Sequence, residues 1–127
     1  MGILGSIKGN GISVKSNAPA DKIYAAVTTA ATQKKHIFDK APMRFFQQVE
    51  PSVINQLFDI EIDAALASSD LNFVIAMSKY DDGVVLAMFC GGEVSMKFGD
   101  FGRGKTRIFA KRAAALLVAQ GYLASVA

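Results

Sequence analysis

The order of apolar and polar positions along the chain predicts a mixture of helices and strands. Residues 12–15 alternate and predict a short strand. After Asn17, apolar residues recur every three or four positions, which predicts a helix over 19–34 that Asn17 caps. A second pattern follows Pro51 and covers 53–66; it is mostly helical, but 58–62 also fit a strand.

The second half of the chain predicts a hairpin sheet followed by a long helix. β-branched and aromatic residues mark the strands, and the Asp-Asp-Gly and Gly-Gly segments between them favour tight turns. Apolar and polar residues alternate in the last strand, so one of its faces should be exposed to solvent. The expected strands cover 73–77, 84–90 and 93–98, and the expected helix covers 106–124.

Together these elements predict an α+β fold, with helices packed on a three-stranded antiparallel sheet in the order α-β-β-β-α. Residues 51–127 would form this domain, and 1–50 would add an N-terminal extension with a short strand and a helix, packed on the core or separate from it. A length of 127 residues, 51% of them apolar, suits one such domain. No apolar run reaches the ~18 residues of a membrane span, so we expect no membrane partner.

The rare residue types exclude several kinds of chemistry. A single cysteine, Cys90, excludes an internal disulfide and a cysteine-based zinc site, and it suits a reducing compartment. The lone His36 argues against a histidine-dependent triad or a histidine-rich metal site. No set of nucleophile, base and orienting group is visible. We therefore expect a cytoplasmic, non-enzymatic protein with no metal and no cofactor.

The charges are grouped along the chain, although the net charge is only +3. Residues 1–49 carry seven bases and two acids, and residues 97–127 carry six bases and one acid. The middle segment, 50–96, carries one base and eight acids. Basic ends could bind a polyanion, or they could neutralise the acidic middle within or between chains.

The glycine-rich segment 99–106 fits two patterns. Its sequence, GDFGRGKT, matches the Walker A motif, and it lies between an expected strand and an expected helix. In a nucleotide site Lys105 would reach the phosphates and Thr106 would hold Mg²⁺. Only 21 residues follow Thr106, and the last helix needs them all, so no later strand can supply a Walker B aspartate.

The same segment, read with the helix after it, resembles the end of the double-stranded RNA-binding domain. That family ends in G-x-G-x-S-K-K-x-A-K-x-x-A-A, and residues 102–115 here read GRGKTRIFAKRAAA. The Gly-Gly-Glu-Val at 91–94 is similar to a turn of the family, and the PSVINQL at 51–57 is similar to the start of its first helix. The resemblance covers about 51–124.

This resemblance implies non-catalytic binding of structured or double-stranded RNA through a basic helix N-terminus. Arg107 and Lys111 lie four positions apart, on one helix face, where they could contact phosphates. The RNA-binding residues carried over by the resemblance are Arg103, Lys105, Arg107, Lys111, Arg112, Asn55 and Gln56. A possible second basic strip consists of Lys34, Lys35, Lys40 and Arg44.

The last helix also supports a different hypothesis. At 100° per residue, Phe109, Ala110, Ala113, Leu116, Leu117 and Ala124 form a core stripe. The apolar Ile108, Val118 and Tyr122 fall on the opposite, outer side. An RNA-facing helix does not need them, so the alternative function is a homo-oligomerisation module of the same fold, a homodimer through these three residues, without RNA binding.

Overall fold

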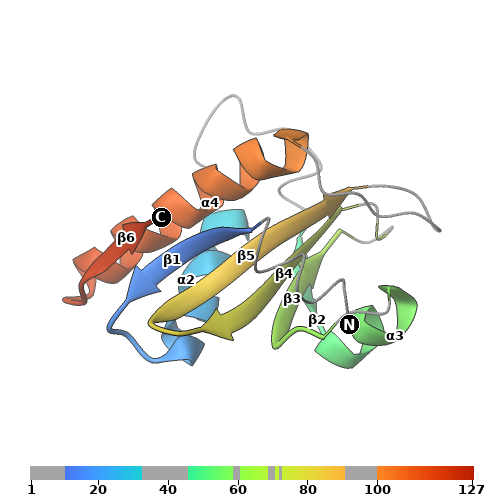
Figure 1. Ribbon diagram of the computed structural model, residues 1–127, viewed down its shortest axis with the longest axis horizontal. Helices are drawn as coiled ribbons and strands as arrows, with labels where there is room; N and C mark the ends of the chain where they lie inside the picture. Colours follow the sequence, from blue (N-terminus) through green and yellow to red (C-terminus); the bar gives the residue numbers. More distant parts are fainter. Residues whose placement is uncertain (1–10, 33–45, 59–60, 69–70, 72, 91–99) are drawn as a thin grey trace.

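The structure is a computed structural model that describes residues 11–32, 46–58, 61–68, 71, 73–90 and 100–127. Helices separate the first strands of this part of the chain, and three consecutive strands then precede the last helix (Figure 1). The strands are β1 (Ile12–Ser16), β2 (Gln47–Val49), β3 (Ala64–Ala67), β4 (Phe73–Tyr80), β5 (Gly83–Cys90) and β6 (Ala124–Val126). The helices are α2 (Ala20–Thr32), α3 (Pro51–Phe58) and α4 (Asp100–Ala119).

The described strands form one antiparallel sheet in the order β2-β3-β4-β5-β1-β6. The α+β class is confirmed, but the sheet has six strands and is larger than the predicted three-stranded one. Strands from residues 1–50 supply part of the difference, because β1 lies between β5 and β6 and β2 forms one edge. The third predicted strand, 93–98, lies outside the described residues.

β1 and β5 approach so closely that one glycine is required. Ile12 pairs with Leu86 and Lys15 pairs with Gly83. A Cβ atom added to Gly83 would overlap the Val14 carbonyl oxygen, so a larger residue would push the two strands apart. The positive φ of the turn before β5 falls on Asp81 (47°), a residue type that tolerates this region.

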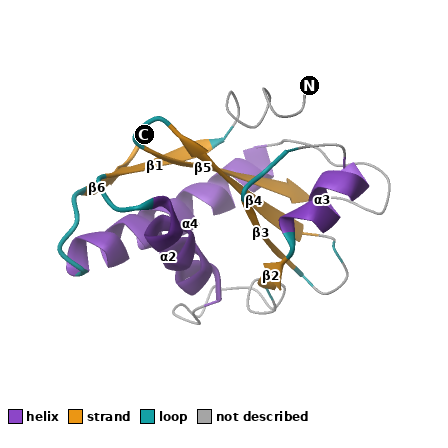
Figure 2. Cartoon of the chain, turned by 90° about the horizontal axis from the view of Figure 1, so that it is seen from below, coloured by secondary structure: helices purple, strands orange, loops and turns teal. Residues whose placement is uncertain are grey.

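The two faces of the sheet carry separate cores. α2 and α4 cover one face, where Ile12, Ile75, Leu86 and Leu117 belong to one buried cluster. α3 lies on the opposite face, as Figure 2 shows, and its Ile54 packs in the second buried cluster with alanines and valines of β3, β4 and β5. Successive residues of these strands alternate between the two clusters, as a pleated sheet requires.

The segment after Pro51 differs from its prediction. The helix α3 ends at Phe58, and Ala64–Ala67 forms the strand β3 between β2 and β4. The predicted helix over 53–66 is therefore wrong in its second half. Leu66 pairs with Ile75 and is fully buried, so hydrogen bonding and burial in the sheet outweigh the helical preference of alanine and leucine.

α4 ends earlier than predicted, at a glycine. Gly121 has a φ of +99°, and its N–H donates to the Val118 carbonyl (3.0 Å). The N–H of Tyr122 donates to the Leu117 carbonyl (3.0 Å), which completes a Schellman cap. The chain then turns back into β6, where Asn17 Oδ1 accepts a hydrogen bond from the Leu123 N–H (3.0 Å). The prediction that Asn17 caps α2 is therefore wrong. Its side chain instead holds the segment that leads into β6.

Candidate functional site

The outer face of α4 carries the two exposed cations that the sequence placed there. Phe109, Ala110, Ala113 and Leu117 are buried against the sheet and α2, as the predicted core stripe requires. Phe109 also meets Phe46 edge to face, with ring centres 6.4 Å apart. Arg107 and Lys111, which lie on the opposite side of the helix, are exposed to solvent.

The glycine-rich segment before Arg107 is not a loop from Asp100 onward. α4 begins at Asp100, so the backbone of 100–106 is helical, and within the segment only the amides of the first turn, 100–103, lack an acceptor in the helix. Thr106, the residue that would hold Mg²⁺, is 2% exposed. The predicted loop is wrong for these residues, and the amides of 104–106 bond within the helix, so they do not form the phosphate-binding loop of a Walker A site.

Only part of the predicted RNA-binding set can be placed on this face. Arg112 is half-buried, and the side chains of Arg103 and Lys105 lie outside the described part of the molecule. The second basic strip, Lys34, Lys35, Lys40 and Arg44, also lies outside the described residues.

Asn55 and Gln56 are not brought together with the cations of α4. They belong to α3, on the other face of the sheet (Figure 2). Asn55 Oδ1 accepts a hydrogen bond from the Ile62 N–H (3.1 Å), so this side chain holds the segment after α3. Asn55 and Gln56 therefore do not share a surface with Arg107 and Lys111.

The apolar residues of the predicted homodimer surface are also divided. Ile108 and Val118 lie on α4 and are 45% and 55% exposed. Tyr122 follows the Schellman cap and packs, partly buried, against the α2–α4 core cluster, so its predicted place on the outer helix face is wrong. Leu123, which the sequence did not single out, is 75% exposed beside it.

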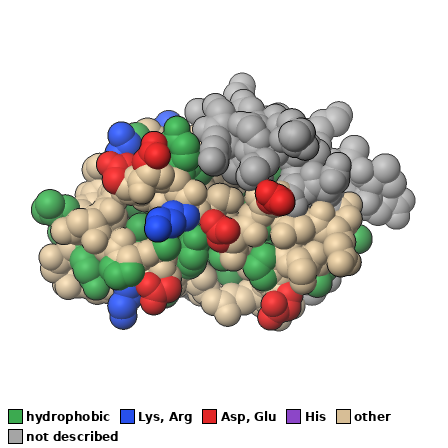
Figure 3. Space-filling view, turned by 60° about the horizontal axis from the view of Figure 1, so that its bottom comes forward, with side chains coloured by type: hydrophobic (Ala, Val, Ile, Leu, Met, Phe, Trp, Pro, Cys, Tyr) green, Lys and Arg blue, Asp and Glu red, His purple; other side chains and the backbone are tan. Residues whose placement is uncertain are grey.

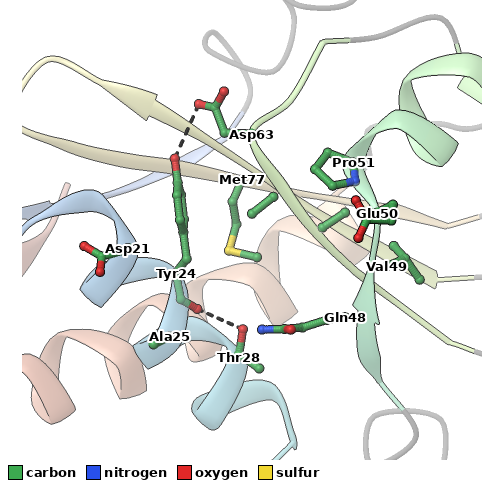
Figure 4. A pocket seen from close by; sticks show the side chains of 12 residues that line it. Asp21, Tyr24, Ala25, Thr28, Gln48, Val49, Glu50, Pro51, Asp63 and Met77 are labelled. Atoms are coloured by element: carbon green, nitrogen blue, oxygen red, sulfur yellow. Dashed lines mark hydrogen bonds between the residues drawn. The ribbon is translucent and has the colours of Figure 1, made fainter.

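A hollow of about 530 Å³ between α2 and the β2–β3 side of the sheet was not predicted. Figure 4 shows Tyr24 reaching from α2 toward Asp63, while Gln48, Glu50 and Met77 come from other segments around the same space. The Tyr24 hydroxyl donates a long hydrogen bond to Asp63 Oδ2 (3.4 Å). Asp63 Oδ2 also accepts a hydrogen bond from the Lys79 N–H (2.8 Å).

The hydroxyl of Tyr24 remains protonated in this environment. Burial, reinforced by the nearby carboxylate of Asp63, raises the pKa of Tyr24 to about 12. At neutral pH the hydroxyl is therefore a donor, and it helps to hold Asp63 in place.

Other features of the described residues limit the chemistry. They contain no group of three His, Cys, Asp or Glu side chains arranged to hold a metal ion. None of the helices in the described ranges is both long and apolar enough to cross a membrane. On the face shown in Figure 3, basic and acidic side chains lie close together rather than in separate blocks.

Comparison of the chain with protein families, curated proteins and solved structures finds no significant match. The resemblance to the double-stranded RNA-binding domain therefore rests on the motif residues alone.

Proposed function

We propose that the protein is a non-catalytic RNA-binding protein that contacts the phosphate backbone of structured RNA through the outer face of α4. The observation that carries this proposal is the exposure of Arg107 and Lys111, one helical turn apart. Side chains four residues apart on a helix lie next to each other, so both cations can contact the same strand.

The composition of α4 supports the same proposal. Its 20 residues contain five bases and one acid, Asp100. A helix with this excess of positive charge attracts a polyanion over several turns, and each neutralised phosphate releases a counterion. Binding of this kind depends on salt and hardly on sequence.

Because α3 and α4 lie on opposite faces of the sheet, fewer residues can take part in the proposed RNA contact. With Asn55 and Gln56 on the other face of the sheet, the 2′-hydroxyl contacts of the family cannot be added to the same surface. The proposed interaction is thus a phosphate contact by one helix. It is expected to be weaker, and to discriminate less between RNA and DNA duplexes, than binding by a complete domain of that family.

The test is a fluorescence anisotropy titration of duplex RNA at two salt concentrations. Replacing Arg107 and Lys111 together by Ala should weaken binding about tenfold at low salt, equivalent to roughly 0.7 kcal/mol per cation. It should also lower the slope of log affinity against log salt by about 2. The matched control replaces Lys15 and Lys79, exposed bases on β1 and β4, by Ala and should bind nearly as the parent does. Equal affinity of both double variants and the parent would overturn the proposal.

The exposed apolar residues on the same helix support a second candidate, self-association. Ile108 and Val118 leave about half of their surface in water, a cost that a partner chain would remove. If this function is the correct one, sedimentation will show a dimer that Val118→Ser converts to a monomer, while RNA affinity is absent or insensitive to Arg107 and Lys111.

A further inference from the structure

The hollow beside α2 is lined by acidic side chains from several parts of the chain. Carboxylates reach it from three segments: Asp21 at the start of α2, Glu50 between β2 and α3, and Asp63 just before β3. No basic side chain is among the described residues that line it. A recess with charges of one sign and low-dielectric walls concentrates the field and raises the local concentration of oppositely charged ligands.

The hollow also has an apolar side. Met77 lies at its base in Figure 4, and Val49, Ala64 and Ala65 line it from β2 and β3. An inorganic cation gains nothing from such a surface, whereas an organic cation can bury methylene groups on it.

One of the three carboxylates is held in a fixed position. Both hydrogen bonds that Asp63 accepts, from Tyr24 and from the Lys79 N–H, go to Oδ2. The Oδ1 atom has no hydrogen bond within the described residues and remains available to a donor from a ligand. A positioned acceptor loses less freedom when a ligand binds than a mobile side chain does.

We propose that this hollow is a binding site for an alkylammonium cation, with its charged group at the Asp63 carboxylate, within the field of Asp21 and Glu50, and its carbon chain against Met77 and Ala64. The site is separate from the outer face of α4 and does not depend on RNA binding. The same chemical group could come from a free diamine or from a lysine side chain of a peptide. Because the three carboxylates are exposed, binding should be weak and sensitive to salt.

The experiment is a titration of the full chain with diaminobutane, followed by amide NMR at low salt. Saturable shifts are expected at the amides of Tyr24, Thr28, Gln48 and Ala64, and not at those of β6. Replacing Asp63 by Asn, which keeps an oxygen acceptor for the Lys79 N–H, should weaken binding about threefold. Adding Glu50→Gln should bring the loss to about tenfold.

Two controls separate a specific site from general electrostatics. Asp81→Asn removes one exposed acid from the β4–β5 turn, away from the hollow, and Asn tolerates the positive φ there, so this variant should bind as the parent does. Butanediol, which is isosteric but neutral, should produce no saturable shift. A second titration with a Gly-Lys-Gly peptide shows whether the site prefers a lysine side chain or a free diamine. Saturable binding of either ligand supports the assignment. Equal shifts with butanediol, or an unchanged affinity in the Asp63/Glu50 double variant, would overturn it.

Discussion

The two faces of the sheet are both buried, but side chains of different size cover them. On the face under α2 and α4, the central strands present large residues such as Ile75, Met77 and Leu86. On the opposite face, Ala65, Ala76 and Ala87 lie in one row across β3, β4 and β5. Side-chain volume determines how closely a covering segment can approach a sheet. The comparison therefore indicates a thick core under two helices and a thin, flat core on the side of α3.

The largest effect is expected on the thick side. Leu86 is fully buried there, and Leu86→Ala should lower the free energy of unfolding by about 3 kcal/mol, because it removes apolar contacts and leaves a cavity. Urea denaturation followed by circular dichroism measures this loss. Val118→Ala, at an exposed position of α4, should change stability by less than about 0.5 kcal/mol. A loss at Leu86 no larger than that at Val118 would contradict the proposed thick core.

A smaller loss of stability is expected on the thin side, where the cause is added volume and not a cavity. Ala76 is fully buried in the middle of the alanine row, so Ala76→Leu adds volume where none is available and should cost about 2 kcal/mol. Ala115→Leu, on the exposed face of α4, makes the same chemical change and should be nearly neutral. If Ala76→Leu is also neutral, the second face is loosely covered and the two faces differ in packing density, not only in thickness.

The smallest effect concerns a buried polar side chain of β4 on the thin side. Ser78 is 4% exposed, and its hydroxyl has no hydrogen-bond partner among the described residues. Ser78→Ala removes an unsatisfied buried group and should leave stability unchanged or raise it by up to about 1 kcal/mol in the same urea assay.

A matched serine provides the control for this prediction. Ser68 is similarly buried, but its Oγ accepts a hydrogen bond from the Phe73 N–H (3.1 Å). Ser68→Ala should therefore destabilise the protein by about 1 kcal/mol. Equal destabilisation by the two substitutions would show that Ser78 has a partner.

The elements with strong local signals could be predicted from the sequence. β4 and β5 form continuous apolar runs around a polar Asp-Asp turn, and both strands and the turn are confirmed. α2 occupies nearly the predicted range. The inward face of α4 was also predictable, because its period of 3.6 is set by local geometry.

Elements that depend on distant pairing could not be predicted. Ala64–Ala67 has the composition of a helix, and only β2 and β4 on its two sides make it a strand. β6 lies beyond Gly121, which ends α4 although the apolar pattern on both sides of it is helical. The segment 100–105 is helical despite its glycines, and a side chain at Gly104 would meet no neighbouring atom within 4 Å.

The candidate sites divide in the same way. The spacing of Arg107 and Lys111 is enough to place them next to each other on a helix, so this pair could be predicted from the sequence. The acidic hollow joins Asp21, Glu50 and Asp63, which are far apart in the chain, and α2 must pack beside β2 and β3 before these carboxylates share a space. Nothing in the local pattern around any of the three indicates the other two.

The position of β1 between β5 and β6 has a consequence for the order of folding. β1 pairs with β5 across about 70 residues of chain, and β6 in turn pairs only with β1 among the described strands. β1 is synthesised before β5, so it has no pairing partner in the sheet until the β4–β5 hairpin has left the ribosome. Pairing over such a separation costs loop-closure entropy before it gains hydrogen bonds, which slows the search. The hairpin is expected to form early, and insertion of β1 beside it to be the late step that allows β6 to join.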